Sequence, residues 1–196
     1  MDYSEVIEFV KKTTSETDRP GTYPFRNAYD HTMRVYRWAI RLQAKLGGDL
    51  DVIVLAALLH DVGWDNERPS HEVSAEVAVE YLDSIGVEPE MIVRVGEIIM
   101  MHKDKDTDKA LSLECCIVMD ADLLDEMGAI GIMSDCMEAG LDDEASYKRA
   151  YYKIKEAYRQ DKPKYSWCKT ETGRTEFAKR MQLVESFIYQ LERELF

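Results

Sequence analysis

The sequence lacks the motifs that mark several common classes of enzyme. Its 196 residues contain no P-loop, no G-x-S-x-G nucleophile elbow and no G-x-G-x-x-G loop, so the usual phosphate-cradling loops and the serine-hydrolase elbow are excluded. The 4 cysteines show no C-x-x-C spacing, and we expect them to be buried or idle thiols rather than metal ligands. No apolar run reaches the length that crosses a membrane.

Acidic residues outnumber basic ones. The 25 Lys and Arg residues face 38 Asp and Glu residues, which gives a formal net charge of -13 and disfavours binding to nucleic acid or to an anionic membrane. The segment from Met1 to Lys12 lacks the charged start and apolar core of a signal peptide. We therefore expect a cytoplasmic protein, in which any anionic substrate must meet a local cation.

Apolar residues repeat at helical spacing along most of the chain. The spacing predicts helices over about 2–16, 27–46, 70–84 and 142–160, a buried helix ending near residue 59, and further helices from about 89, 111 and 173. No segment alternates like a strand, and no internal repeat or linker is evident. We predict an all-α single domain over 1–196, with helices of about 27–134 holding the site and helices of about 142–196 completing the bundle.

The pair His60 and Asp61 follows a run, 52–59, that is apolar on every side. A helix of this kind lies in the interior, so the pair is expected in the core or at its mouth. A buried carboxylate beside a buried imidazole is costly unless the two are hydrogen-bonded or hold a metal.

All four histidines of the chain stand at one end of an apolar helical stripe. They are His31, His60, His71 and His102. One histidine on such a face is more often a satisfied core residue than a ligand. Four of them, with Asp61 and Asp122 on inward faces, are harder to explain by packing.

A metal site can be assembled from four of these residues. The set comprises His31, His60, Asp61 and Asp122. Its two imidazoles and two carboxylates suit one divalent ion, Mn, Fe, Co, Ni, Zn or Mg, and leave coordination positions open for water and substrate. The ligand types suit all of these ions, so they do not identify which metal is bound.

The order of these residues resembles that of the HD-domain metal-dependent phosphohydrolases, in which H, HD and D on separate helices bind one divalent ion. The stretches 30–35, 58–63 and 120–131 and the last helix from Gly173 are similar to the small stand-alone HD hydrolases of bacteria and archaea. The resemblance covers most of the chain from about Asn27. It implies a compact HD-domain helical bundle and hydrolysis of phosphoester or phosphoanhydride bonds.

The resemblance also implies roles for single residues. Asp122 is preferred over Asp120 as the last ligand, because Ala-Asp-Leu-Leu at 121–124 is similar to the family element that carries it. Asp61 is a candidate to orient the attacking water. Many relatives carry carboxylates three and four positions after the HD aspartate. Here Trp64 and Asp65 stand there, so Asp65 is a candidate general base or, alternatively, a turn-capping loop residue.

Two further histidines and two cationic residues are not part of the minimal set, which is the four predicted metal ligands. His71 and His102 either contact substrate or hold a second metal bridged by Asp61, and we favour substrate contact because the minimal set already completes one open site. Arg34, one turn after His31, and Lys103 are the candidate phosphate-binding cations.

The first expectation for the reaction is hydrolysis of a nucleoside triphosphate to the monophosphate and pyrophosphate, with manganese as a suitable ion. Cyclic-nucleotide or monophosphate hydrolysis ranks next. A di-iron HD-type oxygenase and a catalytically silent ligand sensor are rivals from other classes. The long apolar stripe of the last helix either covers the domain's own core or forms a homodimer contact.

Overall fold

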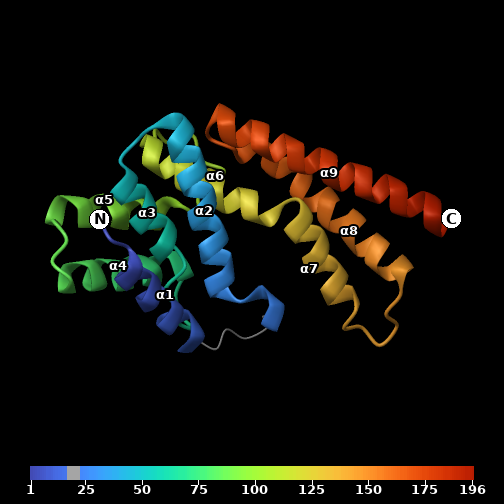
Figure 1. Cartoon of the computed structure of the whole chain (residues 1–196), viewed down its shortest axis with the longest axis horizontal. Coiled ribbons are helices and arrows are strands. Elements are labelled where there is room, and N and C mark those ends of the chain that lie inside the picture. The colour runs from blue at the N-terminus through green and yellow to red at the C-terminus, as the bar shows by residue number, and fades with distance from the viewer. Residues whose placement is uncertain (17–22) are drawn as a thin grey trace.

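The helix α3 (Leu50–Leu59) is the centre of the molecule, and its residues from Val52 to Leu59 are fully buried. The computed structural model describes residues 1–16 and 23–196, and Figure 1 shows them as a bundle of helices. Asp49 begins α3 by accepting a hydrogen bond from the Val52 backbone N–H. No strand occurs in the described ranges, and the all-α prediction is confirmed.

The other helices of the N-terminal part pack around α3. They are α1 (Ser4–Glu16), α2 (Ala28–Leu46), α4 (Ser70–Ser84), α5 (Pro89–Met101) and α6 (Leu113–Glu126), with a short 3-10 helix, η1, at Pro24–Arg26. Asn27 caps α2 as its position predicts, because its side chain accepts a hydrogen bond from the Asp30 N–H.

The C-terminal helices extend from one side of this core (Figure 1). They are α7 (Ala129–Ala139), α8 (Tyr147–Asp161), the 3-10 helix η2 (Lys162–Trp167) and α9 (Glu171–Leu195). The helix predicted from residue 142 begins at Tyr147, because the Ser146 side chain supplies the cap. Gly128 turns the chain between α6 and α7 at a positive φ of 106°, where a Cβ would lie 2.9 Å from Cγ of Arg180.

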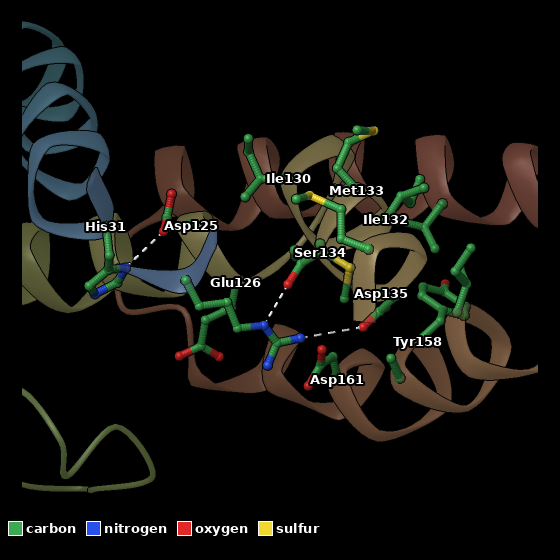
Figure 2. A pocket seen from close by; sticks show the side chains of 18 of the residues that line it. His31, Asp125, Glu126, Ile130, Ile132, Met133, Ser134, Asp135, Tyr158 and Asp161 are labelled. Carbon is green, nitrogen blue, oxygen red and sulfur yellow. Dashed lines mark hydrogen bonds and ion pairs between the residues drawn. The ribbon is translucent and has the colours of Figure 1, made fainter. Parts of the chain in front are cut away.

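A cavity of about 530 Å³ lies between α2, the α6–α7 turn and α8. Figure 2 shows His31 and Asp125 at one end of it, and Asp135, Asp161 and Tyr158 further along. Within residues 1–16 and 23–196, no helix combines the length and apolar character that a membrane span needs.

Candidate metal centre

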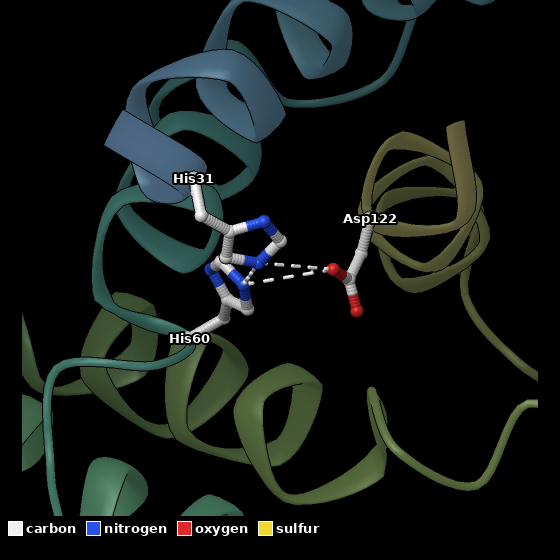
Figure 3. A group of neighbouring side chains, drawn as sticks. All are labelled: His31, His60 and Asp122. Atoms are coloured by element: carbon white, nitrogen blue, oxygen red, sulfur yellow. Dashed lines mark hydrogen bonds and ion pairs between the residues drawn. The ribbon is translucent and has the colours of Figure 1, made fainter. Parts of the chain in front are cut away.

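Three helices bring His31, His60 and Asp122 together (Figure 3). His31 comes from α2, His60 ends α3, and Asp122 lies on α6. The two Nε2 atoms of the histidines are 3.2 Å apart. The Oδ1 atom of Asp122 lies 3.3 Å from Nε2 of His31 and 3.9 Å from Nε2 of His60. Two imidazole nitrogens and a carboxylate oxygen thus converge on one point.

Asp61 adds a fourth donor to this group. Its Oδ2 atom lies 3.8 Å from Nε2 of His31 and 3.7 Å from Nε2 of His60. Metal bonds of about 2.0–2.2 Å place two donors on one ion no more than about 4.4 Å apart. The separations among His31, His60 and Asp122 satisfy that limit, as do those of Asp61 from the two histidines. These four residues are called the HD cluster below; His31, His60 and Asp122 form one group that could hold a divalent ion. Their role as ligands stays a prediction.

Hydrogen bonds at the far ring nitrogens prepare both imidazoles for such a role. Nδ1 of His60 lies 2.9 Å from the Ala57 carbonyl oxygen. A carbonyl only accepts, so this nitrogen carries the proton and leaves the Nε2 lone pair to the cluster. Burial lowers the pKa of His60 to about 4, which keeps the ring neutral at pH 7. A neutral imidazole is the form that binds metal.

Asp125 orients the ring of His31 in the same way. Its Oδ2 atom lies 2.8 Å from Nδ1 of His31. Arg34 donates to the same carboxylate, from Nε to Oδ1 at 2.6 Å and from its Nη2 to Oδ2 at 3.0 Å. Arg34 thus holds the residue that orients His31, a contact that the sequence did not suggest, and it also lines the cavity.

His102 and Lys103 reach the cluster from the end of α5. Nδ1 of His102 donates to the Ile99 carbonyl at 2.6 Å, and its buried Nε2 makes no hydrogen bond within the described chain. That Nε2 lies 3.7 Å from Oδ1 of Asp61, and Nζ of Lys103 lies 3.1 Å from the same oxygen. His60, Asp61 and His102 form a second group in which a metal can be held.

His71 and Asp65 lie apart from these contacts. His71 is half-buried in the first turn of α4, and neither metal-ligand group found among the described residues includes it. The Asp65 carboxylate accepts hydrogen bonds from the backbone N–H of Glu67 at 2.9 Å and of Arg68 at 2.7 Å. These contacts match the turn-capping alternative for Asp65, and its role as a base stays a prediction.

Lys105 is a buried residue of the site that the sequence analysis missed. Its Nζ donates to Oδ2 of Asp122 at 2.6 Å and lies 3.6 Å from Oε1 of Glu126. From the sequence alone, a lysine in the charged segment from Lys103 to Lys109 is expected to be a solvated surface residue. Only the tertiary structure shows that this one compensates a buried carboxylate.

Asp120, the alternative to Asp122 as the last metal ligand, contacts a different part of the chain. Its buried carboxylate accepts hydrogen bonds from the N–H of Lys169 at 2.7 Å and from the N–H and hydroxyl of Thr170 at 2.9 and 2.6 Å. It therefore ties α6 to the segment that begins α9. Asp122, by contrast, lies within 4 Å of the Nε2 atoms of both His31 and His60.

Comparisons with known proteins identify the family of the chain. A family model, the HD domain, matches residues 28–127. The chain is 28% identical over 178 residues to the uncharacterized protein YpgQ of Bacillus subtilis (strain 168), covering 85% of this chain and 83% of YpgQ. The structure is similar to that of an HD-superfamily hydrolase from Bacillus thuringiensis, with a TM-score of 0.75, 27% identity, and coverage of 97% of this chain and 94% of that chain.

A further similar structure contains a nucleotide. The crystal structure of Bacillus subtilis YpgQ in complex with ADP matches with a TM-score of 0.70 and 26% identity, covering 97% of this chain and 93% of that chain. The family match includes every residue of the HD cluster.

Proposed function

This chain belongs to the HD-domain family and is a hydrolase of that superfamily, and from that premise we propose that its substrate is a nucleoside triphosphate, which it hydrolyses to the monophosphate and pyrophosphate. The observation that carries the proposal is the convergence of the HD cluster beside the Lys103 ammonium group. Hydrolysis of a cyclic nucleotide or a monophosphate is the next substrate class for the same site.

His31, His60, Asp61 and Asp122 would hold the metal, and the buried Nε2 of His102, which makes no hydrogen bond within the described chain, supports a cation-binding site here. A divalent ion would supply Lewis acidity, which polarises a phosphoryl oxygen and acidifies a water molecule. The pKa of His31 also indicates that this site favours positive charge. Burial lowers it, but hydrogen bonds to Asp122 and Asp125 prevail and raise it to about 10. The surrounding carboxylates therefore attract positive charge.

The remaining groups supply charge and orientation. Lys103 is the cation nearest to Asp61, and its side chain is 40% exposed, so it can turn toward a phosphate of the substrate. Asp61 orients the attacking water, because its Oδ2 atom faces the Nε2 atoms of His31 and His60 while Nζ of Lys103 lies 3.1 and 3.4 Å from its two oxygens. His71 and Arg34 remain proposed substrate contacts.

The nucleotide class rests on two supports. YpgQ, which is similar in fold and 26% identical, was crystallised with ADP. In this chain a cavity of about 530 Å³ adjoins His31, and cavities of about 300–1,000 Å³ hold ligands of nucleotide size. The phosphates would lie at the HD cluster and the nucleoside in the cavity.

One observation favours a second candidate function. His60, Asp61 and His102 form a group of their own beside the first, and two adjacent groups can hold two metals bridged by Asp61. A di-iron oxygenase uses such a pair, so metal content separates the two candidates.

The deciding experiment measures metal content of the purified protein, followed by phosphate and pyrophosphate release from a panel of nucleoside mono-, di- and triphosphates with Mn²⁺ added. One metal per chain with pyrophosphate from triphosphates supports the proposal. Two irons per chain and no release from any nucleotide support the oxygenase. No bound metal under any loading condition contradicts both and leaves a ligand sensor.

Asp61→Ala provides the matched variant. It should remove both bound metal and turnover, because it deletes a predicted ligand of the HD cluster that also belongs to the second group, with His60 and His102. Asp104→Ala, which alters a 48% exposed carboxylate of the adjoining loop, is its control. Turnover by Asp61→Ala at the wild-type rate would overturn the site. Asp65→Asn tests the alternative base: a large loss of kcat with unchanged stability would transfer that role to Asp65.

A further inference from the structure

Asp135 on α7 is a carboxylate that lines the cavity with little compensation. Its side chain is 14% exposed, and the nearest cation with which it pairs in the described chain is Arg26, with Nη2 at 3.8 Å. No donor of residues 1–16 and 23–196 hydrogen-bonds to it, although Nε of Arg26 donates to the neighbouring Ser134 at 2.6 Å. Ser134 and Asp135 lie side by side along the cavity (Figure 2). The Asp135 carboxylate is partly open to the cavity, so its oxygens can accept hydrogen bonds from a ligand bound there.

The other carboxylates that line the cavity are paired. Asp125 accepts from Arg34, as described above. Glu126 accepts from Nζ of Lys164 at 2.5 Å, and Asp161 lies 2.9 Å from the same ammonium group. Asp135 differs from them in its contacts and in its protonation equilibrium, because burial raises its pKa to about 6. It is therefore the place in the cavity where a ligand gains most by donating hydrogen bonds.

The cavity walls indicate what kind of ligand that is. Apolar side chains line it, among them Phe25, Ile130, Met133 and Tyr158. Its other end reaches His31, so a substrate whose phosphates lie at the HD cluster extends its remaining part between these walls (Figure 2). A flat heterocycle fits apolar and aromatic walls, while its edge is read by polar groups.

We propose that this cavity binds a purine base and that Asp135 selects a base with two adjacent N–H donors, as guanine presents at N1 and its 2-amino group. The inference rests on the proposed nucleotide hydrolysis and names its preferred substrate class. An ionised carboxylate only accepts hydrogen bonds, and its two oxygens match two parallel N–H groups. Adenine places a ring nitrogen lone pair beside its amino group, which would face a carboxylate oxygen.

The test compares kcat/KM for the triphosphates of guanosine, inosine, adenosine and xanthosine. The wild type should prefer guanosine triphosphate by about 10-fold or more, because a site built to hydrogen-bond a group rejects analogues that lack it. In Asp135→Asn, the carboxamide offers one acceptor and one donor. Xanthine has N1–H beside a carbonyl, so kcat/KM for xanthosine triphosphate should rise while that for guanosine triphosphate falls.

A rise in kcat/KM for xanthosine triphosphate in Asp135→Asn cannot result from misfolding. Asp161→Asn removes the same charge from a paired carboxylate of the same cavity and should leave the base preference unchanged. Equal efficiency for all four bases, or an unchanged preference in Asp135→Asn, overturns the inference while the hydrolase proposal stands.

Calorimetric binding of guanosine monophosphate separates the two proposals if no hydrolysis is found. Binding to the wild type that Asp135→Asn weakens by about 10-fold or more supports the base site and overturns only the hydrolysis. Absence of binding and of hydrolysis overturns both.

Discussion

Lys105 and Asp122 form a buried ion pair in which Nζ lies 2.6 Å from Oδ2, while the other oxygen of the same carboxylate faces His31 at 3.3 Å. The two oxygens of Asp122 therefore have different partners. One is neutralised by the protein, and the other is directed into the HD cluster.

Lys105→Met should destabilise the metal-free protein by about 3–5 kcal/mol, because it leaves a buried carboxylate without its counter-charge. Added Mn²⁺ can then neutralise Asp122 in place of the ammonium group, so the rise in Tm on adding Mn²⁺ should exceed that of the wild type. Thermal unfolding with and without Mn²⁺ measures both effects. Lys109→Met, which changes a 67% exposed lysine of the same loop, should leave Tm nearly unchanged.

Asp125→Asn should weaken metal binding by about 10–100-fold, as loss of a partner that orients a metal-bound histidine does. The physical cause is the loss of the carboxylate that accepts from Nδ1 of His31 and is held by Arg34. Titration of the protein with Mn²⁺ against a competing chelator gives the dissociation constants. An unchanged constant would show that His31 needs no such partner.

Gly173→Ala should destabilise the protein by about 1–3 kcal/mol through overpacking. A Cβ at this position would lie 2.1 Å from Oδ2 of Asp120, which is fixed by Lys169 and Thr170. Denaturant unfolding measures the change. Gly96→Ala serves as a comparison, because its Cβ would meet only a methyl group of Val79 at 3.2 Å. A smaller loss at Gly173 than at Gly96 would contradict this account of the α9 start.

Asp135→Asn should raise Tm at pH 7 and leave it unchanged near pH 4. Burial raises the pKa of Asp135 from 3.8 to about 6, so the folded state holds this proton more tightly than the unfolded chain. The associated stability is fully present below about pH 4 and is lost as the pH rises through about 6. Unfolding curves of both proteins between pH 4 and 8 test this, and a difference in Tm that does not vary with pH would contradict it.

The sequence indicates the residues of the HD cluster, but it does not indicate the neighbouring residues that hold them in place. Helical periodicity places His31, His60 and Asp122 on inward faces, and the family order assigns them a common role. Neither reveals that Asp125 and Arg34 hold His31, because those partners are separated by 91 residues and meet only when α2 packs against α6.

The remaining differences have similar causes. Lys105 belongs to a charged segment whose composition resembles that of a solvated loop, so its burial follows from where that loop lies over α6. Asp65 stands at a position where relatives carry a carboxylate, but the turn that follows it offers two backbone N–H groups to the same side chain. Local turn chemistry can use a residue that spacing alone assigns to a site.

His60 and His102 are the C-terminal caps of α3 and α5, and each ring is anchored to a carbonyl of its own last turn. The carbonyl ends of two helix macrodipoles, with their partial negative charge, therefore meet at the HD cluster and favour a cation there. Because main-chain atoms fix these two rings, substitutions of other side chains do not remove their anchors. The walls of the neighbouring cavity can accordingly change in the course of evolution, and with them the choice of substrate, while the orientation of both imidazoles is retained.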